Sequence, residues 1–380
     1  RTEEMSRVQA PPPKPLGVLR GHGTPVNCVG FLSPSAIVSG SGDGVVKVWD
    51  LKSRRELATN PEAHSKAGVL HATALGSSSA SAQRFVTQGR DGYVKLWDAQ
   101  SFSAASEPLL SFYCGSYSFT KVATLRWGNG NGSDAGGSTL ENANLIVSPS
   151  SAQDKARIPP SVLISAVQNE PSDSDRFSMT LTVSDAANKR GMCISLSLFE
   201  SSVAQSENGA AGGLQTYIAV GYEGGQLAIL DLRSGGKVAC EATVTQGANA
   251  LLSFDVTRDG RSAICGSSGE ELYVANFDVG SLTLRSRAFF SCSHGGFSSV
   301  RIRDDQRIVA TAGWDHRVRL FHLRKLKPLA VLKYHSEGVF GLDFSADSAL
   351  LASCSKDQKI ALWSVFPPSP THVSSTLRPY

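Results

Sequence analysis

Four segments of the chain share one pattern, in which an Asp lies six residues before an aromatic residue. The segments are SGSGDGVVKVWD (39–50), TQGRDGYVKLWD (87–98), TAGWDHRVRLFH (311–322) and SCSKDQKIALWS (353–364). Each has Ser or Thr four residues before the Asp. Apolar and polar residues alternate on both sides of a tight turn, which indicates an antiparallel hairpin with one buried face. A chain that repeats such hairpins builds its fold from similar sheet units.

Two weaker copies of the pattern, at 217–232 and 263–278, keep the alternation of strands. The long gap before them could hold two units, or one unit with insertions. Because the segments 128–144, 148–160 and 168–175 are polar and rich in turn residues, we favour one unit. The sequence therefore predicts seven units, with loop insertions at about 128–160 and 201–213.

A His precedes the Asp of each strong copy. Carboxylate, imidazole, hydroxyl and indole groups that recur together suit a buried hydrogen-bond chain, because burying them is costly unless each is paired. The four predicted structural tetrads are His22, Ser39, Asp43 and Trp49; His64, Thr87, Asp91 and Trp97; His294, Thr311, Asp315 and Phe321; and His335, Ser353, Asp357 and Trp363. A hydrolytic site would need one such constellation, so four copies favour a structural role over catalysis.

The pattern resembles the WD40 repeat, whose units of about 40–45 residues form four-stranded propeller blades. The resemblance implies an all-β fold, a seven-bladed WD40 β-propeller. The stretch KPLGVLRGH (14–22) nearly repeats KPLAVLKYH (327–335), which precedes the last unit. That unit has three strand-like stretches before the Pro-rich segment 364–370, so residues 14–22 are predicted to add its fourth strand and close the ring. We expect a flexible lead (1–13), a propeller (14–366) and a flexible tail (367–380).

Composition argues against several functional classes. The chain is 41% hydrophobic and 18% charged with 36 glycines, which is typical of a folded domain with many turns. It has no apolar run of membrane-spanning length, and its first residues lack the apolar stretch of a secretion signal. The seven cysteines form no CxxC pair and are interpreted as buried apolar residues in a reducing compartment. Without a phosphate loop or metal-spaced cluster, we expect no enzyme, cofactor, metal or small-molecule substrate.

Candidate partner-binding residues lie at the predicted hairpin turns. In a propeller, the residue before each tetrad Asp sits beside the turn, on a face that commonly binds partners; here these are Gly42, Arg90, Trp314 and Lys356. An exposed Trp flanked by basic groups can dominate an interface, although Trp314 could also be a core residue. The full set of candidates is Trp314, His316, Arg317, Arg90, Lys356, Phe297 and Phe340, the two Phe residues being equally compatible with the core.

The segment 301–333 carries nine Lys and Arg residues against three Asp residues. A solvated basic face is the favoured interpretation, and an acidic protein partner or nucleic acid is the alternative. Nucleic acid is not among the partners that we expect.

Several strings together resemble one WD40 family. They are ATAGWDHRVRLFH, KPLAVLKYHS, SCSKDQKIALWSVFP, GYEGGQLAILD and QGRDGYVKLWD, and they are similar to the family of G-protein β-subunit-like protein one and its fungal relative, ASTRA-associated protein one. The resemblance covers 14–367, strongest at 307–366 and weakest at 100–215.

This resemblance implies a non-catalytic adaptor. It would work with the Tel/Tti co-chaperone and the R2TP–Hsp90 system to mature and stabilise phosphatidylinositol-3-kinase-related kinases, in support of DNA-damage and growth signalling. In fungi the family is described within the ASTRA assembly linked to chromatin. The protein would be a monomeric propeller within a larger assembly, in the cytoplasm and nucleus.

Three alternatives stay open. One is a chromatin-associated propeller that reads histone tails through its central opening. Another is a ubiquitin-ligase substrate receptor, because WDHR (314–317) matches a WDxR docking string, although it occupies the hairpin turn and not the end of the third strand. The least favoured is a heterotrimer β-subunit, which needs an N-terminal coiled-coil helix where residues 1–13 are short and end in PPP.

Overall fold

A computed structural model of the chain describes most of the predicted repeat region. The described residues are 13–75, 84–115, 121, 123–126, 144–150, 161–167, 177–182, 190–202, 214–232, 234–247, 249–278, 281 and 283–366. For 124–126, 144–150, 161–167, 177–182, 202 and 214 only the backbone is described. Nearly all of the expected lead, the tail and most of both loop insertions lie outside the described residues. Within the described part, no helix is long and apolar enough to cross a membrane.

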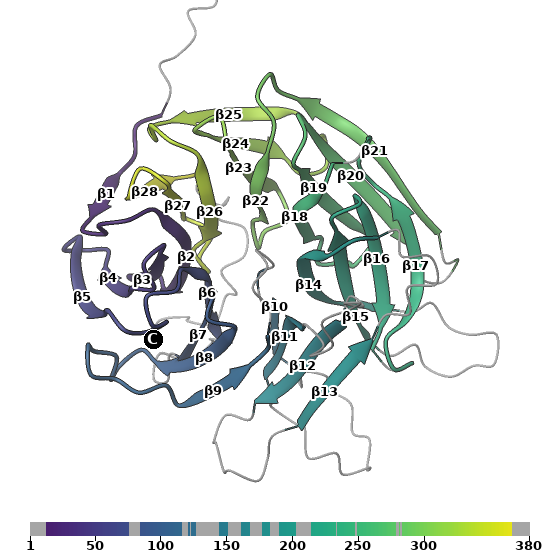
Figure 1. Cartoon of the computed structure of the whole chain (residues 1–380). Coiled ribbons are helices and arrows are strands. Elements are labelled where there is room, and N and C mark those ends of the chain that lie inside the picture. The colour runs from purple at the N-terminus through teal and green to yellow at the C-terminus, as the bar shows by residue number, and fades with distance from the viewer. Residues whose placement is uncertain are drawn as a thin grey trace, which may run out of the picture.

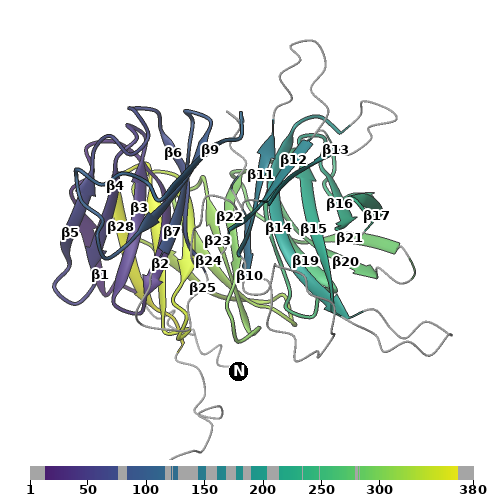
Figure 2. The ribbon, with the colours of Figure 1, turned by 90° about the horizontal axis from the view of Figure 1, so that it is seen from below.

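The strands form seven four-stranded antiparallel sheets arranged around a central axis (Figures 1 and 2). The innermost strand of each sheet contacts the innermost strands of both neighbours, and β26 contacts β2, so the ring is closed. We call the sheets blades one to seven in chain order. The gap between the copies at 87–98 and 217–232 holds one blade, as expected.

The strand bounds, blade by blade, are as follows. Blade one has β2 (Val26–Ser33), β3 (Ala36–Ser41), β4 (Val46–Asp50) and β5 (Arg55–Asn60); blade two has β6 (Val69–Leu75), β7 (Arg84–Gly89), β8 (Tyr93–Asp98) and β9 (Leu110–Tyr113). Blade three has β10 (Ala123–Arg126), β11 (Asn144–Ser150), β12 (Ser161–Val167) and β13 (Phe177–Thr182); blade four has β14 (Cys193–Ser202), β15 (Leu214–Tyr222), β16 (Gln226–Asp231) and β17 (Lys237–Thr243). Blade five has β18 (Leu251–Val256), β19 (Ser262–Ser267), β20 (Glu271–Asp278) and β21 (Thr283–Ser291); blade six has β22 (Phe297–Ile302), β23 (Ile308–Gly313), β24 (Arg317–His322) and β25 (Pro328–Lys333). Blade seven has β26 (Val339–Phe344), β27 (Leu350–Ser355), β28 (Lys359–Ser364) and, from the other end of the chain, β1 (Gly17–Arg20).

The predicted closure by the N-terminal strand is confirmed. Strand β1 pairs antiparallel with β28, with Gly17 opposite Leu362 and Arg20 opposite Lys359, and the two strands lie side by side in Figure 1. Leu19 is 1% exposed and joins the apolar cluster between blades seven and one. The last blade thus gains both backbone partners and buried apolar surface from β1.

Each innermost strand outside blade three carries a β-bulge near its start. A bulge interrupts the ladder, and carbonyls beside it accept hydrogen bonds from the preceding blade. The donors and acceptors are Asn27 Nδ2 to Val69 O (3.0 Å), Ser195 Oγ to Leu251 O (2.9 Å), Ser253 Oγ to Phe297 O (2.9 Å) and Ser298 Oγ to Val339 O. Further down the strands, Asp255 accepts from Ile302 N and Asp343 from Phe31 N, each at 2.7 Å. Side chains therefore connect neighbouring blades at two levels of the ring.

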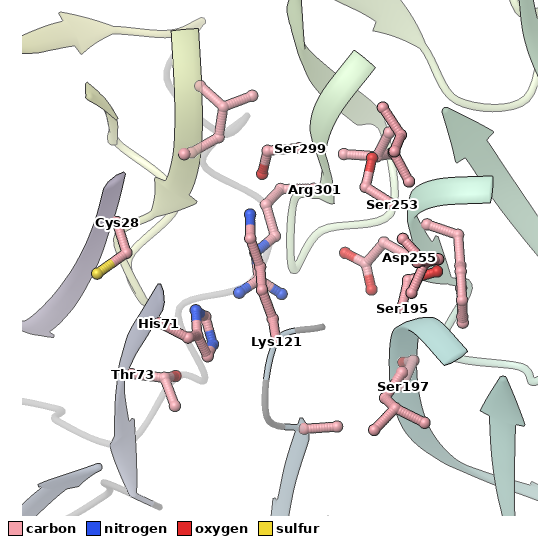
Figure 3. Close-up of a pocket in the computed structure, with 18 of the residues that line it drawn as sticks. Cys28, His71, Thr73, Lys121, Ser195, Ser197, Ser253, Asp255, Ser299 and Arg301 are labelled. Carbon is pink, nitrogen blue, oxygen red and sulfur yellow. The ribbon is translucent and has the colours of Figure 1, made fainter. Parts of the chain in front are cut away.

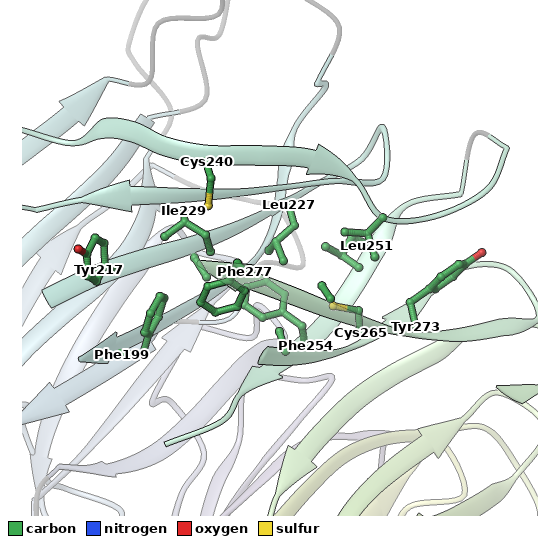
Figure 4. Close-up of a cluster of buried hydrophobic side chains, with 14 residues drawn as sticks. Phe199, Tyr217, Leu227, Ile229, Cys240, Leu251, Phe254, Cys265, Tyr273 and Phe277 are labelled. Carbon is green, nitrogen blue, oxygen red and sulfur yellow. The ribbon is translucent and has the colours of Figure 1, made fainter. Parts of the chain in front are cut away.

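Apolar clusters fill the space between blades. Between blades four and five, Phe199 stacks on Tyr217 and also contacts Phe277, and Leu251 and Cys265 complete the same cluster (Figure 4). Six of the seven cysteines are buried and all are free thiols, as expected from their apolar context, whereas Cys292 is half-buried.

Two of the four predicted tetrads have every expected hydrogen bond. In blade two, His64 Nδ1 lies 3.0 Å from Asp91, His64 Nε2 lies 2.8 Å from Thr87 Oγ1, and the Trp97 indole donates to the same oxygen. In blade seven the equivalent chain runs through Asp357, His335, Ser353 and Trp363. Burial opposes ionisation of Asp91, yet its hydrogen bond and proximity to His64 hold the Asp91 pKa below its usual value. These histidines are buried and paired, which suits a structural role.

The blade-one tetrad is incomplete. His22 and Trp49 both bond Ser39 Oγ, at 2.7 and 2.8 Å, but Asp43 accepts from Ser41 instead of His22. His22 Nδ1 consequently has no partner within the described part of the chain.

The blade-six tetrad predicted from His294, Thr311, Asp315 and Phe321 is wrong. His294 is exposed, and the side chain of Phe321 has no N–H to donate. Thr311 Oγ1 therefore has no hydrogen-bond partner among the described residues. Asp315 is instead paired with Arg319, whose guanidinium also lies over the ring of Phe290. An ion pair within one hairpin stands where blades two and seven have the hydrogen-bond chain.

Replacing Arg303 should weaken the closed ring. Arg303 is 2% exposed, and its guanidinium donates to the carbonyls of Val365 and Phe366 at 2.8 Å and forms an ion pair with Asp305. Arg303→Met leaves these groups unpaired, so the free energy of unfolding, measured in urea, should fall by about 3 kcal/mol or more. The exposed Arg285→Met should change it by less than about 0.5 kcal/mol. Equal stability of the two variants would contradict this role.

The stability of the protein should decrease as the pH is lowered, partly because of His22. Burial, and secondarily Lys47, lowers the pKa of His22 from 6.5 to about 4. Between these values the unfolded chain binds a proton that the folded chain does not, so stability decreases as the pH falls, by about 3 kcal/mol in all. His22→Gln should therefore lose about 2 kcal/mol less than the wild type between pH 7 and 4.5 in urea unfolding. His294→Gln, at an exposed site, is the control, and identical pH profiles of all three proteins would refute the assignment.

Candidate functional site

One end of the ring carries the turn between the second and third strands of each blade other than blade three; we call it the turn face. In six blades the residue that follows the second strand donates its backbone N–H to a carbonyl just before the innermost strand. These residues are Gly42, Arg90, Glu223, Ser268, Trp314 and Lys356, with bonds of 2.9 to 3.0 Å. They occupy equivalent positions around the opening of the central channel. The sequence pattern located four of them and missed Glu223 and Ser268, whose turns lack the tetrad Asp.

Trp314 is the exposed aromatic of this face. Its side chain is 45% exposed in the turn between β23 and β24. The indole lies directly on the backbone of Gly296, where an added Cβ would be 2.0 Å from Cδ2 and where φ is +97°. Only glycine fits there, so the local backbone holds the indole at the surface and not in the core.

Basic residues follow Trp314 in the same hairpin and on the next strand. His316 adopts a left-handed φ of +69° and is exposed, and the exposed Arg317 pairs across the sheet with Lys333, also exposed. The carboxylate of Asp315 is already paired with Arg319. We call Trp314, His316, Arg317 and Lys333 the blade-six patch: an exposed aromatic residue with basic residues that form no ion pair within the described part of the chain.

The other candidate residues are more scattered. Arg90 and Lys356 are exposed on the turn face, and Lys356 lies 3.6 Å from the Glu337 carboxylate. Phe340 is half-buried beside Gly338, which the backbone of Trp314 also approaches. The prediction that Phe297 extends an exposed patch is wrong, because it is 0% exposed and packs between blades five and six.

The WDHR string lies in the hairpin turn of blade six, as the sequence indicated. The aromatic position near the end of the third strand, β24, is occupied by Phe321. Asp315 of the string forms an ion pair with Arg319 in the same hairpin.

A polar cavity of about 200 Å³ occupies the channel (Figure 3). Its charged and imidazole side chains come from four blades: His71 on β6, Lys121 just before β10, Asp255 on β18 and Arg301 on β22. Burial, together with Arg301 and Lys121, keeps the pKa of His71 well below its usual value, so its imidazole is neutral. Sequence reasoning did not find this site. Within the described residues, no group of three or more His, Cys, Asp or Glu could hold a metal.

Comparison with known proteins agrees with this architecture. The family model "WD domain, G-beta repeat" matches residues 13–50, 285–322 and 326–364. The mouse guanine nucleotide-binding protein subunit beta-like protein 1 is 31% identical over 369 residues, covering 96% of this chain and 99% of the relative. ASTRA-associated protein 1 of Aspergillus flavus is 26% identical over 374 residues, covering 88% and 84%, and that of Schizosaccharomyces pombe is 46% identical over 89 residues, covering 23% and 24%.

The repeats, the ring of blades and this likeness over nearly the whole length lead to one conclusion: the chain is a WD40-repeat propeller that belongs to the family of guanine nucleotide-binding protein subunit beta-like protein 1, together with ASTRA-associated protein 1.

Proposed function

We propose that the protein is a non-catalytic scaffold that binds protein partners through the blade-six patch. The observation that carries this proposal is the exposed Trp314 indole, seated on Gly296, in the hairpin whose Arg317 pairs with Lys333. Large aromatic and arginine side chains contribute much of the binding energy at protein interfaces. The positive charge of the patch favours an acidic protein surface as partner.

The family narrows the choice of partner. Relatives of this chain carry the name ASTRA-associated protein, which supports a place within an ASTRA-type assembly. Within it, the partners we propose are the Tel/Tti co-chaperone subunits and, through them and R2TP–Hsp90, the phosphatidylinositol-3-kinase-related kinases. The protein would then support stability of these kinases, DNA-damage and growth signalling, in both the cytoplasm and the nucleus.

Histone-tail reading through the channel is a weaker candidate. Lys121 and Arg301 line the cavity, and their positive charge would repel an inserted lysine side chain. The aromatic cage that reads methylated lysine has no counterpart among the described residues that line this cavity. The position of WDHR in a hairpin turn likewise gives little support to docking on a ubiquitin ligase.

Substitutions in the blade-six patch should weaken partner binding without unfolding the protein. Trp314→Ala is expected to weaken binding of the purified Tel/Tti complex roughly 30-fold, which corresponds to about 2 kcal/mol. Arg317→Glu should act in the same direction by repelling an acidic surface. Calorimetric titration measures both effects, and urea unfolding checks that stability changes by less than about 0.5 kcal/mol.

Matched controls lie elsewhere on the surface. Leu57 on β5 is 63% exposed, and Arg285 on β21 is exposed. Leu57→Ala and Arg285→Glu should bind like the wild type. If the patch variants bind as tightly as these controls, or if only Gγ-like chains or histones bind the wild type, the proposal fails.

A further inference from the structure

Among the described residues, Lys121 is the cation of the channel cavity that forms no ion pair. Figure 3 shows Lys121 at the centre of the channel beside Arg301, with His71 and Ser299 facing the same space. Every blade contributes at least one residue to the cavity wall. The cavity is therefore a common interior of the ring and is separate from the blade-six patch on its rim.

Arg301 is compensated by acidic neighbours. Its guanidinium Nε lies 3.9 Å from Asp343 Oδ1, and Asp255 lies close enough to interact electrostatically with it. Both carboxylates also accept a backbone N–H from the next blade. Burial raises the pKa of the Asp255 and Asp343 carboxyl groups. Neither of them forms an ion pair with Lys121.

Lys121 has a different environment. Its ammonium donates to the carbonyls of Ser298 and Phe340, at 3.3 and 3.4 Å, which are the extra residues of the bulges in blades six and seven. No carboxylate of the described residues forms an ion pair with it, and neutral His71 cannot supply negative charge. Burial, and then the charge of Arg301, lowers the pKa of Lys121 to about 8, so it is still charged at pH 7. A half-buried ammonium with two long bonds to neutral oxygens is poorly compensated.

The cavity offers what an anion would need. It has room for several water-sized groups, and Lys121 supplies a charged donor. The Ser299 hydroxyl and the His71 ring face the same space, and Ser195 and Ser253 already use their hydroxyls to bond the next blade. We propose that this cavity is a binding site for a small oxyanion of the phosphate or carboxylate class, held by Lys121 and by the hydroxyl and imidazole donors around it. The bound anion would join blade three to blades six and seven across the channel and stabilise the ring.

The test is anion-dependent unfolding of the full chain at pH 7. Wild type and Lys121→Met are unfolded thermally in rising inorganic phosphate, with sodium chloride adjusted to constant ionic strength. Phosphate is also weakly excluded from protein surfaces and stabilises proteins generally, so the difference between the two proteins is the signal. The exposed Lys52→Met controls for loss of one positive charge.

The expected result has two parts. In chloride alone, Lys121→Met should have a higher thermal unfolding midpoint than the wild type. The substitution removes a poorly compensated charge and leaves an unbranched apolar side chain in its place. Phosphate should then raise the midpoints of the wild type and Lys52→Met by several degrees more than that of Lys121→Met, along a saturating curve. Equal phosphate responses of wild type and Lys121→Met would overturn the site.

A second titration identifies the source of the oxyanion. N-acetylglutamate amide presents the carboxylate that a partner's acidic side chain would insert, whereas inorganic phosphate represents a free anion. A Lys121-dependent response to phosphate indicates a free oxyanion, and a response to the glutamate probe alone indicates a partner side chain. Absence of a Lys121-dependent response to both probes rejects the proposal, while leaving partner binding by the blade-six patch unaffected.

Discussion

The pairing of β1 with β28 is the interaction on which the rest of the molecule depends. Six blades are built from consecutive strands, and the seventh is complete only with a strand from the opposite end of the chain. The strand contributes its hydrogen bonds and the buried Leu19, and Arg303 of blade six holds the chain where it leaves β28. Because each innermost strand contacts two others, opening the ring at this seam would expose apolar surface on both adjoining blades.

Blade six shows how structure and surface function are linked. Its hairpin has exchanged the buried histidine and indole for an Arg319–Asp315 pair, and its tryptophan stands instead at the turn. The ion pair removes the only acidic side chain of the turn from competition with outside groups. A glycine with a left-handed backbone then supports the indole from below. The loss of an internal hydrogen-bond chain and the gain of an exposed aromatic platform therefore occur in the same hairpin.

The sequence could predict the fold well and the site only in part. The hairpins could be recognised because strand alternation is a short-range property of the sequence. Closure pairs strands from opposite ends of the chain, and it was indicated by the duplicated KPL-x-VL stretch. The tetrads of blades two and seven followed from residue types alone. The blade-six tetrad did not, because the Phe321 side chain has no N–H to donate and Arg319 forms an ion pair with Asp315. Phe297 was ambiguous because alternation cannot tell which side of a strand faces a neighbouring blade, and Lys121 was missed because its acceptors are bulge carbonyls of distant blades.

The side-chain hydrogen bonds to the bulge carbonyls point the same way along the chain. Asn27, Ser195, Ser253 and Ser298 each donate to a carbonyl that is synthesised later, so blades two, five, six and seven each meet a donor that is already present. The closing contact spans almost the whole chain, because Phe31 N donates to Asp343. The nascent N-terminal blade must therefore keep one sheet edge unsatisfied until translation is almost finished. A chaperone that shields this edge during synthesis would protect the protein when it is most prone to aggregate.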